Sequence, residues 1–230
     1  MSDRVLLVTG GSTGIGAATA RAAVADGYRV ALAARTASKL DSLVEELGGS
    51  DRALPITCDV TDKASQQAMV RTTLDHFGRI DAVFANAGIG GKPGGFCGAD
   101  SDVWKDMILT NVYGVGLTIQ CSAEALKATQ GHLLITGSAA GRATIPGSMY
   151  SATKWAVSAI GYGVREELRG TGIRTTLIEP GMVDTPFFDD QPEHALADRD
   201  IAASVMYALS QPPSVDVNEI LVRPTPSLDT

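Results

Sequence analysis

The sequence is poor in several residue types, and each shortage excludes a class of protein. It has 3 cysteines among 230 residues, and Cys58, Cys97 and Cys121 are spaced unlike a disulfide framework. No cysteine and histidine cluster has the spacing of metal ligands, and no apolar run is long enough to span a membrane. Lysine and arginine number 19 against 26 aspartate and glutamate, so the net charge of −7 offers no basic footprint for nucleic acid.

Histidine is equally scarce. The 3 histidines, His76, His132 and His194, suggest no catalytic triad with a serine, and no nucleophile elbow is present. His132 opens a predicted strand, which favours a structural role, whereas a substrate contact by His194 is left open. The chain runs from Met1 into a strand without a signal peptide, so we expect a cytoplasmic protein with reduced thiols.

Short apolar runs alternate with helical stretches along the chain. Such runs are typical of strands buried on both faces of a parallel sheet, and the helices between them imply right-handed crossovers. We predict an α/β protein: a single-domain Rossmann fold over residues 1–230, with a doubly wound, seven-stranded parallel sheet flanked by helices. The expected strands are 5–8, 29–33, 53–58, 80–85, 132–136, 174–178 and 219–222. Long helices are expected at 102–127 and 150–169, and an irregular segment at 180–200.

A glycine-rich turn follows the first predicted strand. Gly10 allows an unusual backbone angle, and Gly14 and Gly16 permit close approach of a cofactor and of the helix backbone. The helix that begins near Ile15 directs its N-terminal amides and partial positive charge toward the turn. The turn therefore predicts a binding site for the pyrophosphate of a dinucleotide.

Tyr150 and Lys154 lie four residues apart, on one face of a predicted helix. A lysine ammonium beside a phenol stabilises the phenolate, so we expect the pKa of Tyr150 to lie below its reference value of about 10. A phenol tuned toward the working pH can exchange a proton with an alcohol or carbonyl oxygen. Together with a dinucleotide site, this pair predicts hydride transfer.

The order of these motifs resembles that of the short-chain dehydrogenase/reductase family over nearly the whole chain. The family's glycine, Asn-Ala-Gly and Pro-Gly segments are matched by Thr9, Gly10, Gly14, Gly16, Asn86, Ala87, Gly88, Pro180 and Gly181. Its catalytic set is matched by Asn111, Ser138, Tyr150 and Lys154. Several ordered motifs at this spacing carry more weight than a glycine motif alone.

The resemblance implies a role for each catalytic residue. Tyr150 is the general acid in carbonyl reduction and the base in alcohol oxidation, and Lys154 lowers its pKa and can bind the nicotinamide ribose. Ser138 holds and polarises the substrate oxygen. Asn111 interrupts helical bonding and supports a water that links Lys154 to solvent.

One departure from the family concerns the step of 12 residues from Ser138 to Tyr150, about one residue short of the usual spacing. The shortage falls in 141–148, where a loop can absorb it. Ser138 therefore stays the candidate, and Thr136 is a weaker one.

The end of the second predicted strand favours NADP(H) over NAD(H). An acidic residue there would hold the ribose hydroxyls and repel a 2′-phosphate. Ala34 takes that place, and Arg35 can bind a phosphate through charge-assisted hydrogen bonds. The predicted cofactor residues are Gly10, Ser12, Thr13, Gly14, Ile15, Gly16, Arg35, Thr36, Asp59, Val60, Asn86, Ala87, Gly88, Tyr150, Lys154, Pro180, Gly181, Val183 and Thr185.

The substrate pocket is expected to form from 88–98, 139–149 and a substrate loop around 182–200. Arg142 is left open between an anchor for a substrate carboxylate and a solvated loop charge. The C-terminal segment 219–225 resembles the subgroup of 3-hydroxy acid and serine dehydrogenases. The expected apolar lining suits a ketone or aldehyde and comprises Ile89, Phe96, Ile145, Met149, Met182, Phe187 and Phe188.

Three functions remain open. The first is an NADP-dependent carbonyl reductase or alcohol dehydrogenase that acts on small molecules, 3-hydroxy acids included. The second is a 3-oxoacyl thioester reductase, although the net charge of −7 gives no support for docking an acidic carrier protein. The third is a catalytically silent NADP-binding sensor, against which the presence of Tyr150 and Lys154 argues. The family implies a homotetramer or a dimer built on the helices that carry Asn111 and Tyr150.

Overall fold

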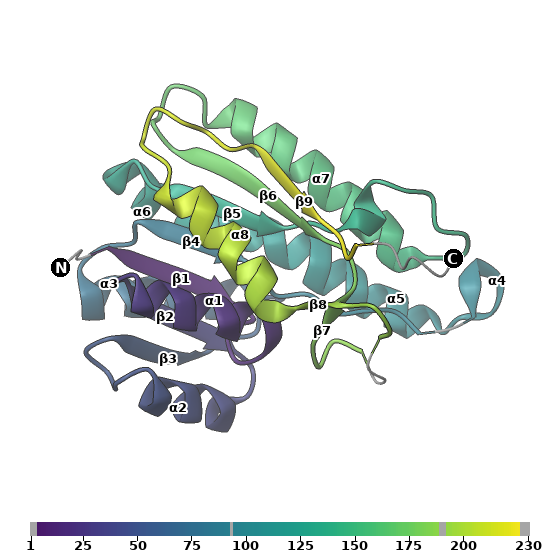
Figure 1. The fold of residues 1–230 in the computed structure, drawn as a ribbon, viewed down its shortest axis with the longest axis horizontal. Helices are drawn as coiled ribbons and strands as arrows, with labels where there is room; N and C mark the ends of the chain where they lie inside the picture. The colour runs from purple at the N-terminus through teal and green to yellow at the C-terminus, as the bar shows by residue number, and fades with distance from the viewer. Residues whose placement is uncertain (1–3, 93, 189–191, 226–230) are drawn as a thin grey trace.

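The computed structural model describes residues 4–92, 94–188 and 192–225. Within these residues seven parallel strands form one sheet in the order β3-β2-β1-β4-β5-β6-β9 (Figure 1). The chain builds outward from β1 in one direction and then in the other, which is the doubly wound arrangement and confirms the predicted fold. The strands are β1 Val5–Thr9, β2 Arg29–Ala34, β3 Ala53–Thr57, β4 Ala82–Ala85, β5 His132–Thr136, β6 Arg174–Pro180 and β9 Glu219–Val222.

Helices cover both faces of the sheet (Figure 1). Side chains of successive strand residues point to opposite faces, so Leu6 and Val8 pack with one set of helices and Val5 and Leu7 with the other. The first set is α1 Gly14–Ala25, α2 Ala37–Glu46 and α8 Asp198–Ser210, and the second is α3 Lys63–Phe77, α6 Gly114–Thr129 and α7 Met149–Glu167. None of the helices in the described part of the chain is long and apolar enough to cross a membrane.

Two segments differ from their predicted form. The helical stretch predicted at 102–127 is α5 Ser101–Ile108 and α6, joined by a π-helical turn, η1 Leu109–Tyr113. The segment predicted to be irregular contains a short parallel pair, β7 Val183–Asp184 and β8 Leu196–Ala197, which anchors both ends of the substrate loop. Residues 189–191 of that loop lie outside the described residues.

His132 is a buried histidine at the start of β5, as its structural role predicted. Its Nε2 lies 2.7 Å from Oγ1 of Thr176, and that hydroxyl donates to the carbonyl oxygen of Val217. The hydroxyl therefore accepts from Nε2–H, so Nδ1 carries no proton when the ring is neutral. Burial lowers the pKa of His132 to about 3, and nearby Arg174 contributes to the shift.

We expect His132 to make the protein less stable in acid. In the unfolded chain this histidine gains its proton below about pH 6.5, whereas in the folded protein it stays neutral down to about pH 3. Stability is therefore lost as the pH falls through this window, by about 2 kcal/mol between about pH 7.5 and about pH 5. Urea unfolding of the wild type and of His132→Gln at both pH values measures the effect. An equal loss in the variant would contradict it.

Candidate active site

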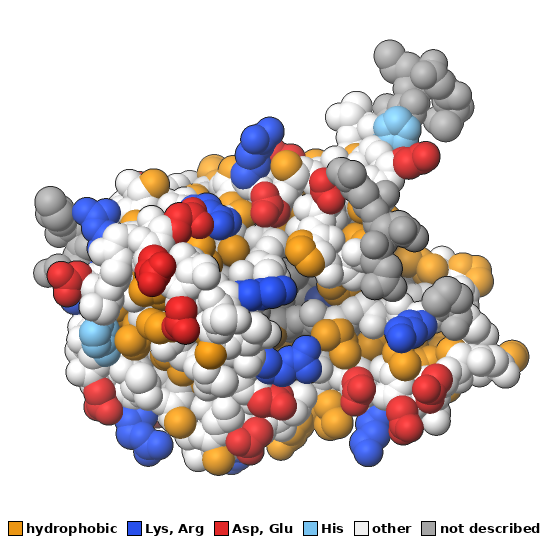
Figure 2. Space-filling model, turned by 90° about the horizontal axis from the view of Figure 1, so that it is seen from below, with side chains coloured by type: hydrophobic (Ala, Val, Ile, Leu, Met, Phe, Trp, Pro, Cys, Tyr) orange, Lys and Arg blue, Asp and Glu red, His pale blue; other side chains and the backbone are white. Residues whose placement is uncertain are grey.

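A cavity of about 440 Å³ lies at the carboxyl ends of the central strands. Every predicted cofactor residue except Gly16 lines it, although these residues come from segments spread between Gly10 and Thr185. Lys39, Cys58 and Thr110 also line the cavity and were not predicted. Figure 2 shows lysine and arginine side chains beside the central hollow of the face that it views.

The glycine turn is shaped by close backbone contacts. Gly10 has φ +65° and Gly14 has φ +51°, both in the left-handed region that favours glycine. A Cβ on Gly16 would lie 2.3 Å from the carbonyl oxygen of Gly10, so the close approach of Gly16 is to the turn itself. A Cβ on Gly14 would meet the side chain of Thr185 at 3.1 Å. The turn thus leaves its backbone and the N-terminus of α1 facing the cavity, which suits a phosphate group.

Asn86 ties the ends of three strands together. Its Nδ2 donates to the carbonyl oxygen of Thr9 at 3.1 Å, and its Oδ1 accepts from Oγ1 of Thr136 at 3.1 Å. The backbone amides of Asn86 and Ala87 donate to Oγ1 of Thr9 at 3.0 and 3.2 Å. These hydrogen bonds hold the ends of β1, β4 and β5 together beside the cavity.

Two cationic side chains, Arg35 and Lys39, line the end of the cavity that lies away from Tyr150. Arg35 follows β2, and Lys39 lies in the first turn of α2 on the same side of the cavity. Asp59 is also part of the wall, and its carboxylate accepts from the backbone and hydroxyl of Thr61, which lowers the pKa of Asp59. Lys39 was missed, although a lysine in the first turn of the helix that follows Arg35 was a usable signal.

Tyr150 and Lys154 lie on the first turns of α7, which begins after Ser148 caps it through Ser151 N–H at 3.0 Å. Lys154 is buried, and its Nζ donates to the carbonyl oxygen of Thr136 at 2.8 Å. The same Nζ lies 5.7 Å from the centre of the Tyr150 ring. The structure thus brings together the pair that the sequence predicted.

The pKa of Tyr150 is shifted in the direction opposite to the prediction: it is raised rather than lowered. Burial raises it to about 12, and the hydrogen bond with Ser138 opposes this shift only in part. Burial also lowers the pKa of Lys154 to about 8, which leaves the lysine mostly protonated at neutral pH. The ammonium of Lys154 donates to the carbonyl oxygen of Thr136. Burial of the phenolate, rather than the charge of Lys154, therefore sets the direction of the pKa shift of Tyr150.

Ser138 lies at the start of a short 3-10 turn, η2 Ala139–Gly141, after β5. Its Oγ accepts from the backbone N–H of Ala140 at 3.0 Å and donates to the carbonyl oxygen of Pro180 at 3.4 Å. The shortened loop before Tyr150 has therefore not displaced the serine, since both residues line the same two cavities.

Asn111 lies in the π-helical turn, which agrees with the predicted interruption of helical bonding. Its side chain exchanges two hydrogen bonds with the backbone of Ile89, both of 2.9 Å, and donates to Oγ1 of Thr153 at 3.1 Å. Asn111 thus fixes the loop after β4 against α7. Its role in a water path stays a prediction.

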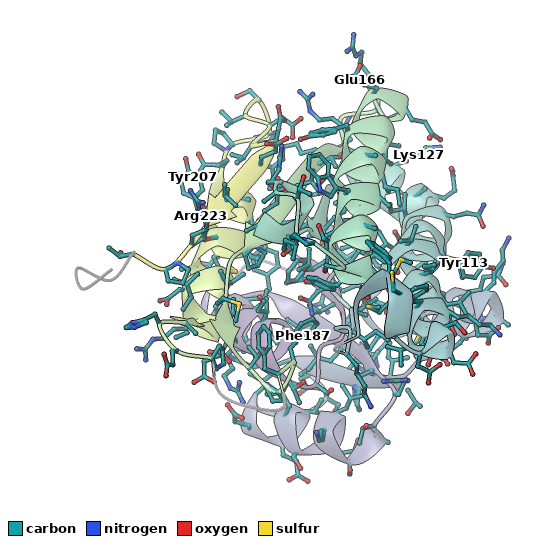
Figure 3. The ribbon with its side chains drawn as sticks, turned by 90° about the vertical axis from the view of Figure 1, so that its right-hand side faces the viewer. Tyr113, Lys127, Glu166, Phe187, Tyr207 and Arg223 are labelled. Carbon is teal, nitrogen blue, oxygen red and sulfur yellow. The ribbon has the colours of Figure 1, made fainter. Side chains whose placement is uncertain are left out.

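A second, wider cavity of about 1590 Å³ adjoins the first and shares Gly90, Ser138, Tyr150, Gly181, Phe187 and Phe188 with it. The predicted residues Ile145, Met149 and Met182 line it, together with Trp104 and Met107, which were not predicted. Phe187, labelled in Figure 3, packs edge-on against the ring of Tyr150 at 5.6 Å. The apolar lining that was predicted is therefore present, apart from Ile89 and Phe96.

Three predicted pocket residues have other positions or remain open. Ile89 lines the first cavity rather than the second, and the exposed Phe96 lines neither cavity and packs on Trp104 at 5.9 Å. His194 lines the second cavity with φ +52°, an uncommon conformation for a residue other than glycine. A contact between His194 and substrate stays a prediction.

Arg142 does not anchor a substrate and is not a free loop charge. It lines neither cavity. Its Nε lies 2.8 and 2.9 Å from the two carboxylate oxygens of Glu179, and its guanidinium also pairs with Glu219. The substrate anchor and the solvated loop charge, the two interpretations offered by the sequence, are therefore both wrong. The sequence did not reveal the ion pairs because Glu179 on β6 and Glu219 on β9 are far from Arg142 in the chain.

Residues 4–195 match the family model described as short chain dehydrogenase. The chain belongs to this family. An uncharacterized oxidoreductase of Staphylococcus saprophyticus is 37% identical over 231 residues, a match that covers 97% of this chain and 98% of the relative. The short-chain dehydrogenase is therefore an oxidoreductase of known fold, and its similarity to relatives spans almost the whole chain.

Solved structures agree with this assignment. An alcohol dehydrogenase from the archaeon Thermococcus sibiricus, complexed with 5-hydroxy-NADP, has a TM-score of 0.87 and 31% identity, with 95% of each chain covered. A 3-ketoacyl-(acyl-carrier-protein) reductase from Brucella melitensis, complexed with NADH, has a TM-score of 0.89 and 25% identity, with 96% of each chain covered. Similar structures thus include complexes with both kinds of nicotinamide cofactor.

Proposed function

We propose that this short-chain dehydrogenase transfers a hydride between NADP(H) and a small carbonyl or alcohol substrate. The substrate class comprises ketones, aldehydes, secondary alcohols and 3-hydroxy acids. The observation that carries the proposal is the shared wall of the two cavities. Ser138 and Tyr150 lie where a cavity suited to a dinucleotide meets an apolar cavity suited to a substrate.

The chain's own residues supply binding and proton transfer. The reaction draws its hydride from NADPH when that cofactor is bound. Ser138 Oγ holds the substrate oxygen, and the phenol of Tyr150 gives its proton to that oxygen as negative charge develops. Tyr150 is protonated at neutral pH, as an acid in the reductive direction must be, although its raised pKa makes the phenol a weaker acid. Lys154, held by Thr136, places a positive charge behind the phenol.

The preference for NADP(H) rests on charge at the far end of the cavity. Arg35 and Lys39 line it, and Ala34 stands where an acid would repel a 2′-phosphate. Neither cation forms an ion pair within the described part of the chain. Both are therefore available to a phosphate.

Replacing Arg35 with leucine should lower the efficiency of the enzyme with NADPH but not with NADH. A charged hydrogen bond to phosphate contributes enough that kcat/KM for NADPH should fall about 10- to 100-fold, while kcat/KM for NADH should stay near its original value. Steady-state kinetics with both cofactors measure the change, and Arg52→Leu, on the loop before β3 and outside the cavity, is the matched control. Equal losses with both cofactors would contradict the assignment.

The proposed activity is tested by following NADPH and NADH oxidation at the nicotinamide absorbance. The panel should contain aldehydes, ketones, β-keto acids and β-keto thioesters. We expect turnover of small carbonyl compounds with NADPH. Turnover confined to thioesters would favour the 3-oxoacyl thioester reductase, and tight NADPH binding without turnover of any class would favour the silent sensor.

We also propose assembly into a homotetramer, or into a dimer, through the exposed sides of α5 to α7. Trp155 and Tyr162 on α7 are about half exposed, as are Ile108 and Tyr113 on the neighbouring helical segment. Tyr113 is labelled in Figure 3. Exposed apolar side chains of this size are typical of an interface. The mass in solution distinguishes the two assemblies. The cytoplasmic location and the absence of nucleic-acid and membrane partners stay predictions.

A further inference from the structure

Glu179 is a carboxylate buried directly behind the catalytic serine. Its side chain is 1% exposed, at the end of β6 and one residue before Pro180. A Cβ on Gly137, the neighbour of Ser138, would lie 2.9 Å from Cγ of Glu179. Glu179 therefore packs against the backbone at the point where the chain leaves β5 for Ser138.

Arg142 provides the positive charge for this carboxylate. Its Nε bonds both carboxylate oxygens at 2.8 and 2.9 Å, and Ser158 donates to one of them at 3.3 Å. The guanidinium also forms an ion pair with Glu219 on β9 and lies 5.7 Å from the centre of the Tyr162 ring. A buried carboxylate without such a partner is strongly disfavoured, so this pairing fixes where Arg142 can be.

The pair joins the two segments between which Ser138 lies. Arg142 directly follows η2, the turn that begins at Ser138. Glu179 directly precedes Pro180, whose carbonyl oxygen accepts the hydroxyl of Ser138 at 3.4 Å. The turn itself is closed by the amides of Gly141 and Arg142, which donate to the carbonyls of Ser138 and Ala139.

We propose that Arg142 is a positioning residue: by pairing with Glu179, it holds the Ser138 turn against Pro180 so that Ser138 faces Tyr150. The inference rests on the proposed function, because it assigns a role in that reaction. Arg142 lines neither cavity, so it acts through Ser138.

The variants separate positioning from folding. Arg142→Met leaves Glu179 unpaired, whereas Arg142→Met combined with Glu179→Met removes both charges and should restore much of the lost stability. Arg142→Lys keeps the charge but not the two-oxygen geometry, so it should rescue activity only in part. Arg21→Met is the matched control, since Arg21 also pairs with both carboxylate oxygens of a glutamate, Glu46, at 2.6 and 2.8 Å, but on the surface and away from the site.

The kinetic readout asks whether Arg142 acts through Ser138. The folded double variant should lose about 10- to 100-fold in kcat, with KM for NADPH near its original value. In a Ser138→Ala background, Arg142→Lys should have no further effect on kcat, because the group it positions is already gone. Unchanged kcat in the double variant, or losses that simply multiply in the Ser138→Ala background, would overturn the proposal.

Backbone amide hydrogen exchange gives a readout that needs no turnover. In Arg142→Met and in the double variant, exchange should become faster in 137–142, and in Arg21→Met it should not. Unchanged exchange in this segment would overturn the proposal even if the protein reduced no carbonyl compound. Absence of turnover in the wild type would count against the proposed function alone, since the exchange result would still decide the role of Arg142.

Discussion

Tyr150→Phe should lower kcat for carbonyl reduction by about 10²- to 10⁴-fold while the affinity for NADPH stays unchanged. The substitution removes only the hydroxyl that gives the proton. The remaining ring can keep its edge-on packing against Phe187, at a centre-to-centre distance of 5.6 Å. Steady-state rates measure kcat, and quenching of protein fluorescence by NADPH measures binding.

The control for this variant is Tyr113→Phe. Tyr113 is 47% exposed on the turn before α6 and lines neither cavity, so losing its hydroxyl should leave the rate unchanged. If Tyr150→Phe retained a rate close to that of the wild type, another group would have to give the proton, and the assignment of Tyr150 would be wrong.

Gly16→Ala should destabilise the protein by about 3 kcal/mol and abolish tight NADPH binding. The added Cβ would lie 2.3 Å from the carbonyl oxygen of Gly10 and 2.9 Å from Nδ2 of Asn86. The first of these atoms belongs to the backbone and cannot turn away, so the glycine turn must move. Urea unfolding and NADPH titration measure the two effects.

Gly98→Ala adds the same methyl group at the last residue of α4, Gly95–Gly98, where no atom lies within 4 Å of the new Cβ. Its stability should stay within about 0.5 kcal/mol of the wild type, and NADPH should bind as before. A similar small effect at Gly16 would mean that the turn adapts easily, which would remove the reason for requiring glycine there.

The sheet was predictable because its strands are short apolar runs that end at glycine or polar residues. Val5–Thr9 is buried at every position, as a strand covered on both faces must be. The cofactor cavity followed from the same order, since the carboxyl ends of parallel strands meet at one edge. Residues as distant as Gly10 and Thr185 therefore line one cavity.

The remaining features depend on tertiary contacts that one sequence does not display. In the π-helical turn, the side chain of Asn111 forms hydrogen bonds with Ile89 and Thr153, which lie on two other segments of the chain. The pKa of Tyr150 is raised by burial, whereas its spacing from Lys154 indicated only the attraction of two charges. Glu179, one of the two carboxylate partners of Arg142, lies 37 residues away from it, which no local pattern reveals.

The most direct test of hydride transfer follows the hydride itself. The protein should be incubated with NADPH that carries deuterium at C4 of the nicotinamide, in either configuration, and with a ketone that it turns over. We predict that one of the two labelled cofactors yields an alcohol with deuterium on the carbinol carbon, as mass spectrometry can show. An alcohol free of deuterium with both cofactors would contradict hydride transfer from the nicotinamide.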